Sequence, residues 1–174
     1  MKVKEITPKE FEKYLQEFVG RDLTDFYYIV DRLMVFRAGK KYQYDETFVK
    51  GKKKPMYRSE YELRIWGNWK FEKDGQIIET SDPKPNEGGP NFRGRMSNFS
   101  ESINPKKVTA IKVSEDGKMA EIYLDIGGKF IITPDEDMFI SYKNRSYDCG
   151  GKFISSHSAG PAENTGVLTY FEAP

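Results

Sequence analysis

Alternating apolar and polar side chains run through most of this chain, and this pattern is typical of half-buried β-strands. It is clearest in three short segments, Val108–Val113, Ala120–Ile126 and Lys129–Thr133. Glycine-containing turns separate these segments, and tight turns of this kind connect antiparallel strands. In the middle segment every second residue is aliphatic from Ile122 onward. The series therefore predicts an antiparallel meander with one face in the core and one face in water.

Helical spacing is clear at the N-terminus, where it predicts one helix over residues 7–20. Thr7 and Glu10 form a capping box, and Pro8 stands at the first helical position. Five apolar residues follow at the spacing of one helical stripe: Phe11, Tyr14, Leu15, Phe18 and Val19. Gly20 is placed to end the helix in the left-handed conformation that glycine adopts without strain.

The segment Tyr61–Phe71 contains both tryptophans and alternates as a strand does. Leu63 and Ile65 share its apolar face. Trp69 returns to that face if the Gly-Asn pair before it forms a bulge or a tight turn, so Trp69 is predicted in the core. Trp66 points away from the same face. It is a candidate for contact with a partner, because exposed aromatic side chains often anchor interfaces, and packing against the N-terminal helix is the alternative.

Shorter apolar runs extend the expected sheet over about residues 24–142: Phe26–Val30, Leu33–Phe36 and Met138–Tyr142. Three stretches predict loops: the lysine-rich Lys50–Lys54, the Pro/Gly-rich Asp82–Arg95 and the tail 144–174, for which an edge hairpin is the alternative. Residues 97–104 predict at most a short helical turn. A chain of 174 residues fits one domain, residues 1–174. The expected fold is α+β, with the N-terminal helix packed on a mainly antiparallel, twisted β-sheet.

The charge balance disfavours a nucleic-acid partner. Charged residues make up 32% of the chain, yet they cancel to a net charge of +1. General binding to a phosphate backbone usually requires a clear basic excess. The run Lys50–Lys54 has aromatic residues nearby, which is the combination that binds single strands. A solvated lysine surface is the favoured interpretation of this run, and a nucleic-acid or small-ligand binding module is the alternative.

The expected compartment is the cytoplasm. The single cysteine, Cys149, excludes an internal disulfide and fits a reducing compartment. The first residues lack the apolar stretch of a signal peptide, and no apolar run approaches the roughly 20 residues of a membrane helix, so no membrane partner is expected. A secreted protein that lacks its signal is the alternative.

The sequence predicts no catalytic residue, no metal ligand and no cofactor. The only histidine, His157, is interpreted as a solvated loop residue, and Cys149 as a small buried residue before a glycine turn. A small enzyme that uses a Cys149–His157 thiolate pair is the alternative. One Cys and one His are too few for a zinc site. The acidic run Asp135–Asp137 does not have EF-hand spacing, and no glycine pair has the pattern of a phosphate-binding loop.

Three segments together resemble a family of small bacterial proteins: Asp31–Gly39, Tyr61–Phe71 and Asp74–Ile77. In that family a Met-x-Phe-x-x-Gly strand precedes a Leu-x-Ile-x-x-x-Trp-Arg-Ile strand. The residues that match, and that are expected to be structural anchors, are Phe36, Gly39, Leu63, Ile65 and Trp69. The similarity covers about residues 31–133. Lys70 stands where the family usually has Arg, and Arg37-Ala38 replaces a more aromatic pair.

Several members of this family look like immunity proteins that accompany polymorphic toxins. The resemblance therefore implies a non-enzymatic protein that binds and occludes a cognate toxin. Acidic turns, together with the 82–95 loop, are the candidate contact surface, because a negative patch would steer a basic nuclease toxin toward the protein. With the exposed tryptophan, the candidate partner-binding residues are Glu115, Asp116, Asp135, Glu136, Asp137 and Trp66.

Overall fold

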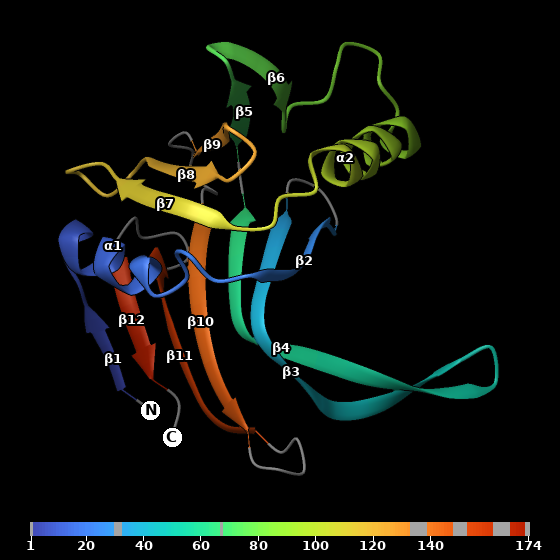
Figure 1. The fold of residues 1–174 in the computed structure, drawn as a ribbon, viewed down its shortest axis with the longest axis vertical. Helices are drawn as coiled ribbons and strands as arrows, with labels where there is room; N and C mark the ends of the chain where they lie inside the picture. Colours follow the sequence, from blue (N-terminus) through green and yellow to red (C-terminus); the bar gives the residue numbers. More distant parts are fainter. Residues whose placement is uncertain are drawn as a thin grey trace.

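The computed structural model describes residues 2–29, 33–66, 68–132, 139–147, 153–161 and 168–172. Within these residues the chain forms two antiparallel β-sheets with two helices packed against them (Figure 1). The predicted α+β class is confirmed, and so is a helix near the N-terminus. The single expected sheet is replaced by two, because the strands divide into a set of seven and a set of five.

The larger sheet has the strand order β1-β12-β11-β10-β4-β3-β2. Its strands are β1 (Lys2–Glu5), β2 (Leu23–Tyr28), β3 (Met34–Val49), β4 (Lys52–Trp66), β10 (Phe139–Tyr147), β11 (Phe153–Pro161) and β12 (Leu168–Glu172). The smaller sheet has the order β6-β5-β9-β8-β7. Its strands are β5 (Trp69–Lys73), β6 (Gln76–Thr80), β7 (Val108–Val113), β8 (Ala120–Leu124) and β9 (Gly128–Ile132). Strands β7, β8 and β9 run across the direction of β10, β4 and β3 (Figure 1).

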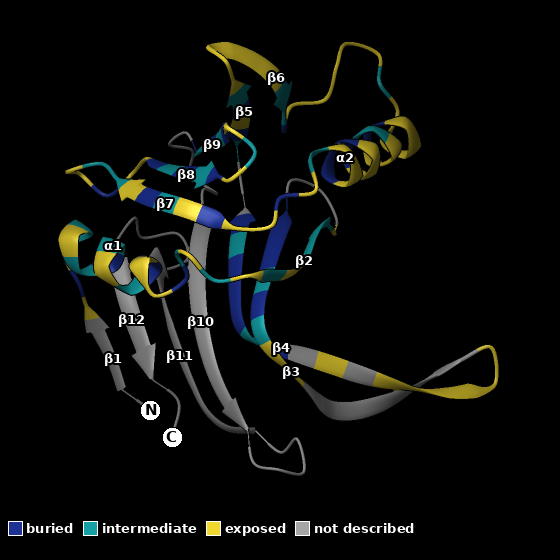
Figure 2. Cartoon of the chain, in the orientation of Figure 1, coloured by how far each residue is buried: buried dark blue, intermediate teal, exposed yellow. Residues whose placement is uncertain are grey.

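An aromatic core joins the two sheets. Phe36 of β3 lies edge-on to Phe130 of β9, with ring centroids 5.8 Å apart, and Phe130 lies 5.1 Å from Trp69 of β5. Strands β8 and β9 bury every second residue, as the alternating pattern of the meander predicts. Figure 2 shows buried positions on β3 and β4 where these strands approach the smaller sheet. Each such side chain stabilises the fold by roughly 1.5–3 kcal/mol through burial of apolar surface.

The tryptophan segment contributes to both sheets. β4 ends at Trp66 and β5 begins at Trp69, so the alternating segment crosses from the larger sheet to the smaller one. Its apolar face is buried, since Leu63 and Ile65 are 0% exposed and Trp69 is 1% exposed. The Trp69 ring stacks on Phe99, with centroids 5.7 Å apart. The side chain of Trp66 lies outside the described residues.

Helix α1 (Pro8–Gln16) has the predicted capping box. The Thr7 hydroxyl accepts the backbone N–H of Glu10 at 3.2 Å, and the Glu10 carboxylate accepts the backbone N–H of Thr7 at 2.8 Å. The helix ends at Gln16, earlier than predicted, and residues 17–20 form turns. Gly20 has the expected positive φ of +79°, and its N–H donates to the carbonyl of Val108, which fixes the end of this segment to β7.

A second helix, α2 (Gly89–Ile103), stands where the sequence predicted a loop over 82–95 and at most a helical turn over 97–104. Two glycines in the helix cost about 1 kcal/mol each in intrinsic propensity, which is the reason for the wrong prediction. Phe92, Met96 and Phe99 recur at helical spacing and are all buried. Their burial outweighs the propensity cost, so packing decides the conformation.

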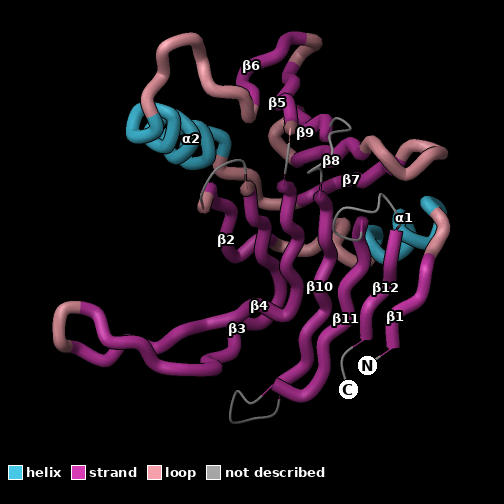
Figure 3. The backbone as a smooth tube through the Cα atoms, turned by 180° about the vertical axis from the view of Figure 1, so that it is seen from behind, coloured by secondary structure: helices cyan, strands magenta, loops and turns pink. Residues whose placement is uncertain are grey.

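Strands β3 and β4 continue beyond the sheet as a two-stranded arm, residues 41–59 (Figures 1 and 3). Neither β2 nor β10 pairs with this part of the two strands. The register shifts between Ala38 and Lys41, and Gly39 there has a φ of +80°. The predicted loop Lys50–Lys54 is correspondingly short. Only Lys50 and Gly51 form the turn, and Lys52–Lys54 belong to β4.

The tail after residue 144 is also more regular than predicted. β11 and β12 join β10 in the larger sheet, and β12 pairs with β1 at the N-terminus. The sequence suggested loops here because β11 contains many small residues and little apolar alternation. Pairing with the adjacent strands β10 and β12 supplies the backbone hydrogen bonds of β11 instead.

Candidate binding groove between β6 and α2

Strand β6 is an edge of the smaller sheet and exposes two aliphatic side chains. Within the described residues it pairs with β5 alone. Ile77 is 48% exposed and Ile78 is 54% exposed. A register shift opposite Phe71 and Glu72 leaves Ile78 without a ladder partner. The turn before the strand is the predicted Asp74-Gly75, with φ values of +53° and +74°. An edge of this kind presents backbone donors and acceptors together with apolar surface.

An open groove of about 620 Å³ separates β6 from α2. Ile78 forms the side of the groove that belongs to β6. On α2 the exposed lining residues are uncharged: Pro90, Asn91, Gly94, Asn98 and Ser102. Phe99 also lines the groove, and its ring packs on Trp69 and Phe71 in the core. The groove therefore combines apolar contact surface with amide and hydroxyl groups that can both donate and accept hydrogen bonds.

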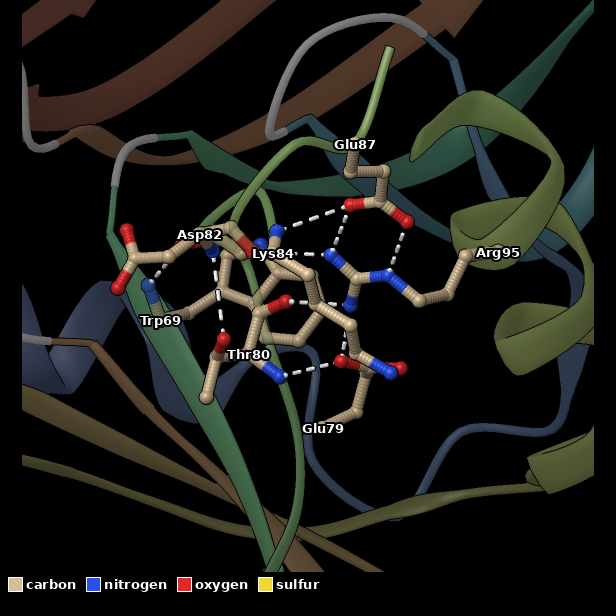
Figure 4. A network of polar contacts seen from close by, with 8 residues as sticks. Trp69, Glu79, Thr80, Asp82, Lys84, Glu87 and Arg95 are labelled. Atoms are coloured by element: carbon tan, nitrogen blue, oxygen red, sulfur yellow. Dashed lines mark hydrogen bonds and ion pairs between the residues drawn. The ribbon is translucent and has the colours of Figure 1, made fainter. Parts of the chain in front are cut away.

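Arg95 of α2 holds the two sides of the groove together (Figure 4). Its Nε and Nη2 donate to the two carboxylate oxygens of Glu87, each at 2.9 Å. Its Nη1 donates to Glu79 of β6, and its Nη2 donates to the carbonyl of Asp82 at 2.8 Å. Bidentate pairing of this kind fixes orientation as well as charge. We call these contacts the Arg95 network.

The contacts in the Arg95 network shift the pKa values of Glu87 and Arg95. Hydrogen bonds from Arg95 and from the backbone N–H of Lys84 lower the pKa of Glu87 to about 2. The hydrogen bond with Glu87, together with the charge of Glu79, raises the pKa of Arg95 above its usual value. The side chains of Arg95, Glu79 and Glu87 are only 13%, 14% and 10% exposed. These three charged groups are therefore engaged with one another, and they shape the groove.

The chain between β6 and α2 is also fixed to the core. Ser81 is fully buried, and its hydroxyl accepts the backbone N–H of Trp69 at 2.9 Å. The backbone N–H of Ser81 donates to the carbonyl of Trp69 at 2.9 Å. The predicted loop residues 82–87 are thus held to the core tryptophan at one end, through Ser81, and to Arg95 at the other.

The acidic residues proposed from the sequence lie elsewhere. Glu115 and Asp116 are exposed in the turn between β7 and β8, at the opposite edge of the smaller sheet from β6. Asp116 accepts the Ser114 hydroxyl and the backbone N–H of Lys118, and these bonds lower the pKa of its carboxyl. Asp116 therefore organises its own turn, while Glu115 remains exposed beside it.

Other sequence candidates fall partly outside the described residues. Asp135, Glu136, Asp137 and Cys149 lie outside them. His157 lies in β11, in register with Asn144 of β10, and is not in a loop. Among the described candidates, the 82–95 segment lines the β6–α2 groove, through Asn91, Gly94 and Arg95 on α2, and the acidic turn does not. The individual groove residues of that segment were not identified, because it was predicted as a loop and not as a helix. The spacing of Phe92, Met96 and Phe99 was the signal that could have identified the helix.

A buried charged cluster on the larger sheet was also missed. Glu62 is 1% exposed and accepts from Arg37 at 2.9 Å and from Arg64 at 2.6 Å. The guanidinium of Arg37 lies 5.1 Å from the centre of the Tyr27 ring, and burial raises the pKa of Tyr27. The alternating pattern places Glu62 on the polar face of β4, but it does not show that neighbouring strands cover that side chain. Because the buried Glu62 carboxylate pairs with both Arg37 and Arg64, this cluster is interpreted as structural.

Among the residues that the structure describes, no group of three or more Asp, Glu, His or Cys side chains is arranged to hold a metal ion. No helix in the same part of the chain has the length and apolar character needed to span a membrane. Comparison of the chain with protein-family models, with curated proteins and with solved structures finds no match.

Proposed function

We propose that this chain is a non-enzymatic binding protein of the immunity type, which neutralises a bacterial toxin by occluding it. The observation that supports a binding role best is the edge strand β6, whose exposed Ile77 and Ile78 lie beside a groove fixed by Arg95. The immunity role itself rests on the resemblance of residues 31–133 to proteins of that kind. A role in the cytoplasm belongs to the same proposal.

The geometry suggests how a partner would dock. An extended segment of the toxin would add to the free edge of β6, where main-chain hydrogen bonds give affinity. Its side chains would contact Ile78, and the amides of Asn91 and Asn98 would hydrogen-bond its polar groups. Because the Arg95 network already fixes the groove walls, binding would cost little ordering of the protein. Exposed Glu115, on the other edge of the sheet, would act at most in long-range steering.

The test is binding to the toxin encoded by the neighbouring gene, measured by titration calorimetry with the full chain. Ile78→Asp places an unpaired carboxylate in the groove and should weaken binding at least tenfold. Gly94→Arg fills the groove, and a side chain at this position meets no atom within 4 Å in the protein itself. It should therefore block the partner without unfolding the chain.

Two matched variants serve as controls. Met119→Asp makes the same change at another exposed apolar residue, 40% exposed beside the β7–β8 turn. Gly89→Arg makes the same change at the first residue of α2, which does not line the groove. Both should bind as the unchanged protein does. Absence of micromolar binding by the unchanged chain would reject the immunity role, and equal binding by the groove variants would reject this docking site.

A further inference from the structure

Two arginines on the outer face of the larger sheet share one buried carboxylate. Arg37 of β3 stands opposite Glu62 of β4 in the register, and Arg64 follows Glu62 by two residues. Successive side chains of a strand point to opposite faces, so these three point away from Phe36 and Leu63 in the core. Helices α1 and α2 both bury apolar side chains in that core, so they lie on its side of the sheet and leave the outer face uncovered.

Glu62 fixes each of the two guanidiniums through its Nε atom. Its Oε2 accepts from Nε of Arg37 at 2.9 Å, and its Oε1 accepts from Nε of Arg64 at 2.6 Å. A guanidinium has further N–H donors on its two Nη nitrogens. Within the described residues, these Nη donors of Arg37 and Arg64 make no hydrogen bond, and the two side chains are 25% and 31% exposed. Both arginines are therefore held in place while their outer donors stay available to a ligand.

Tyr27 of β2 adds a hydroxyl donor beside this pair. The centre of its ring lies 5.1 Å from the guanidinium of Arg37. Burial raises the pKa of Tyr27, so its hydroxyl stays protonated and can donate at neutral pH. In the register Val35 of β3 stands between Tyr27 and Arg64 and is 0% exposed. Strands two apart are separated by roughly 10 Å, so the long side chains of Tyr27 and Arg64 can reach one small ligand above this apolar base.

The charges of this group leave the arginine pair positive. Arg37 and Arg64 carry two positive charges, and the single carboxylate of Glu62 balances one of them. Asp25, which stands opposite Arg37 on β2, is itself paired with Lys41 at 3.0 Å. An anion that binds here gains attraction from both guanidiniums and finds them already oriented, so little ordering of the protein opposes binding.

We propose that Arg37, Arg64 and the Tyr27 hydroxyl form a phosphate-binding site on the outer face of the larger sheet, with Glu62 as the positioning residue. One guanidinium fork already occupies both oxygens of a carboxylate. A phosphate group offers three strong acceptor oxygens and carries a charge of about −1.5 to −2 at pH 7. It therefore matches two guanidiniums from different strands and a hydroxyl better than a carboxylate does. The planar fork of arginine suits this contact, whereas lysine provides only a point charge.

The experiment titrates the full chain with inorganic phosphate at pH 7 and constant ionic strength, and follows the heat of binding. Arg37→Lys and Arg64→Lys keep a cation for Glu62 but remove the fork, so each should weaken phosphate binding about tenfold or more. Arg93→Lys makes the same change at an exposed position on α2 and should leave binding unchanged. Tyr27→Phe removes only the hydroxyl and should weaken binding by about threefold to tenfold. This variant tests the site even if a lysine variant fails to fold, which circular dichroism detects.

Two further ligands distinguish the source of the phosphate group. Methyl phosphate bound as tightly as inorganic phosphate would assign the site to phosphate monoesters, and much weaker binding would assign it to the free ion. Acetate bound as tightly as phosphate would overturn the preference for phosphate. The proposal itself would be overturned by the absence of phosphate binding at about 10 mM, or by equal affinities for the unchanged chain and the folded site variants. Toxin binding should be the same in these variants, because the β6–α2 groove belongs to the other sheet.

Discussion

At the scale of single residues, Arg95 joins parts of the molecule that come from different elements. Its guanidinium contacts Glu79 on β6, Glu87 before α2 and the carbonyl of Asp82 between them. These partners precede Arg95 by eight to sixteen residues. Nothing local in the sequence links them, so the network could not be predicted until the helix placed Arg95 over β6.

Removing the guanidinium should destabilise the protein. Arg95→Ala leaves two carboxylates that are 14% and 10% exposed without their partner. The free energy of unfolding should fall by about 1–3 kcal/mol, because a weakly solvated charge that loses its partner is costly. Urea denaturation monitored by circular dichroism measures this difference. Arg93→Ala, at an exposed position on the same helix, should change stability by less than about 0.5 kcal/mol. Equal losses in both variants would contradict a structural role for Arg95.

The pKa of Glu87 predicts how stability changes in acid. The folded protein holds this pKa at about 2, below the ordinary value of 4.5, so the unfolded chain binds the proton more readily. The contribution of Glu87 is therefore complete above about pH 4.5 and is lost as the pH falls toward 2. Glu87→Gln should be less stable at pH 7 and should lose less stability over that interval. Urea midpoints measured from pH 7 to pH 2 test this, and parallel pH profiles for the two proteins would refute it.

At the scale of elements, the glycine turns and the helix cap could be predicted from neighbouring residues. The division of the strands between two sheets could not. The meander β7–β9 follows from alternation and from glycine turns, and Gly117 and Gly127 indeed have positive φ values of +72° and +79°. The capping box of α1 is equally local. Helix α2 was missed because propensity was weighed above the apolar spacing. β11 pairs with β10 and β12, its neighbours in the sequence, and only an edge hairpin was offered there because β11 has little apolar alternation.

Helix α2 should become more stable when its interior glycine is replaced. Gly94 has an ordinary helical backbone, and a Cβ added there meets no atom within 4 Å. Gly94→Ala should raise the free energy of unfolding by about 0.5–1 kcal/mol, because alanine loses less conformational entropy in a helix. Thermal denaturation detects a change of this size. Gly39→Ala is the contrasting variant, since its φ is +80° and a Cβ would meet Glu60 at 2.7 Å. It should destabilise the protein, and a stabilising effect there would contradict the described bulge.

At the scale of the whole molecule, the two sheets share one core. The buried cluster runs without interruption from Leu15 on α1 through Phe36 on β3 to Phe130 on β9. The β6–α2 groove lies at the edge of this core, because Phe99 belongs to the buried cluster and also lines the groove. Within the described residues, core-facing side chains of both sheets belong to this one cluster. Because one buried cluster joins both sheets, we predict that residues 1–174 behave as a single domain.

Unfolding should therefore be one cooperative transition in which both sheets are lost together. Trp69 is 1% exposed and lies 5.1 Å from Phe130 of β9, so its fluorescence reports on the interface of the sheets. In a Trp66→Phe variant Trp69 is the only tryptophan, and its emission can be followed during urea denaturation. Far-ultraviolet circular dichroism of the same samples follows the strands of both sheets. Coincident midpoints are expected, because exposure of Trp69 removes the packing that each sheet needs. A fluorescence transition at lower urea, with most of the strand signal intact, would show that the larger sheet folds without the smaller one.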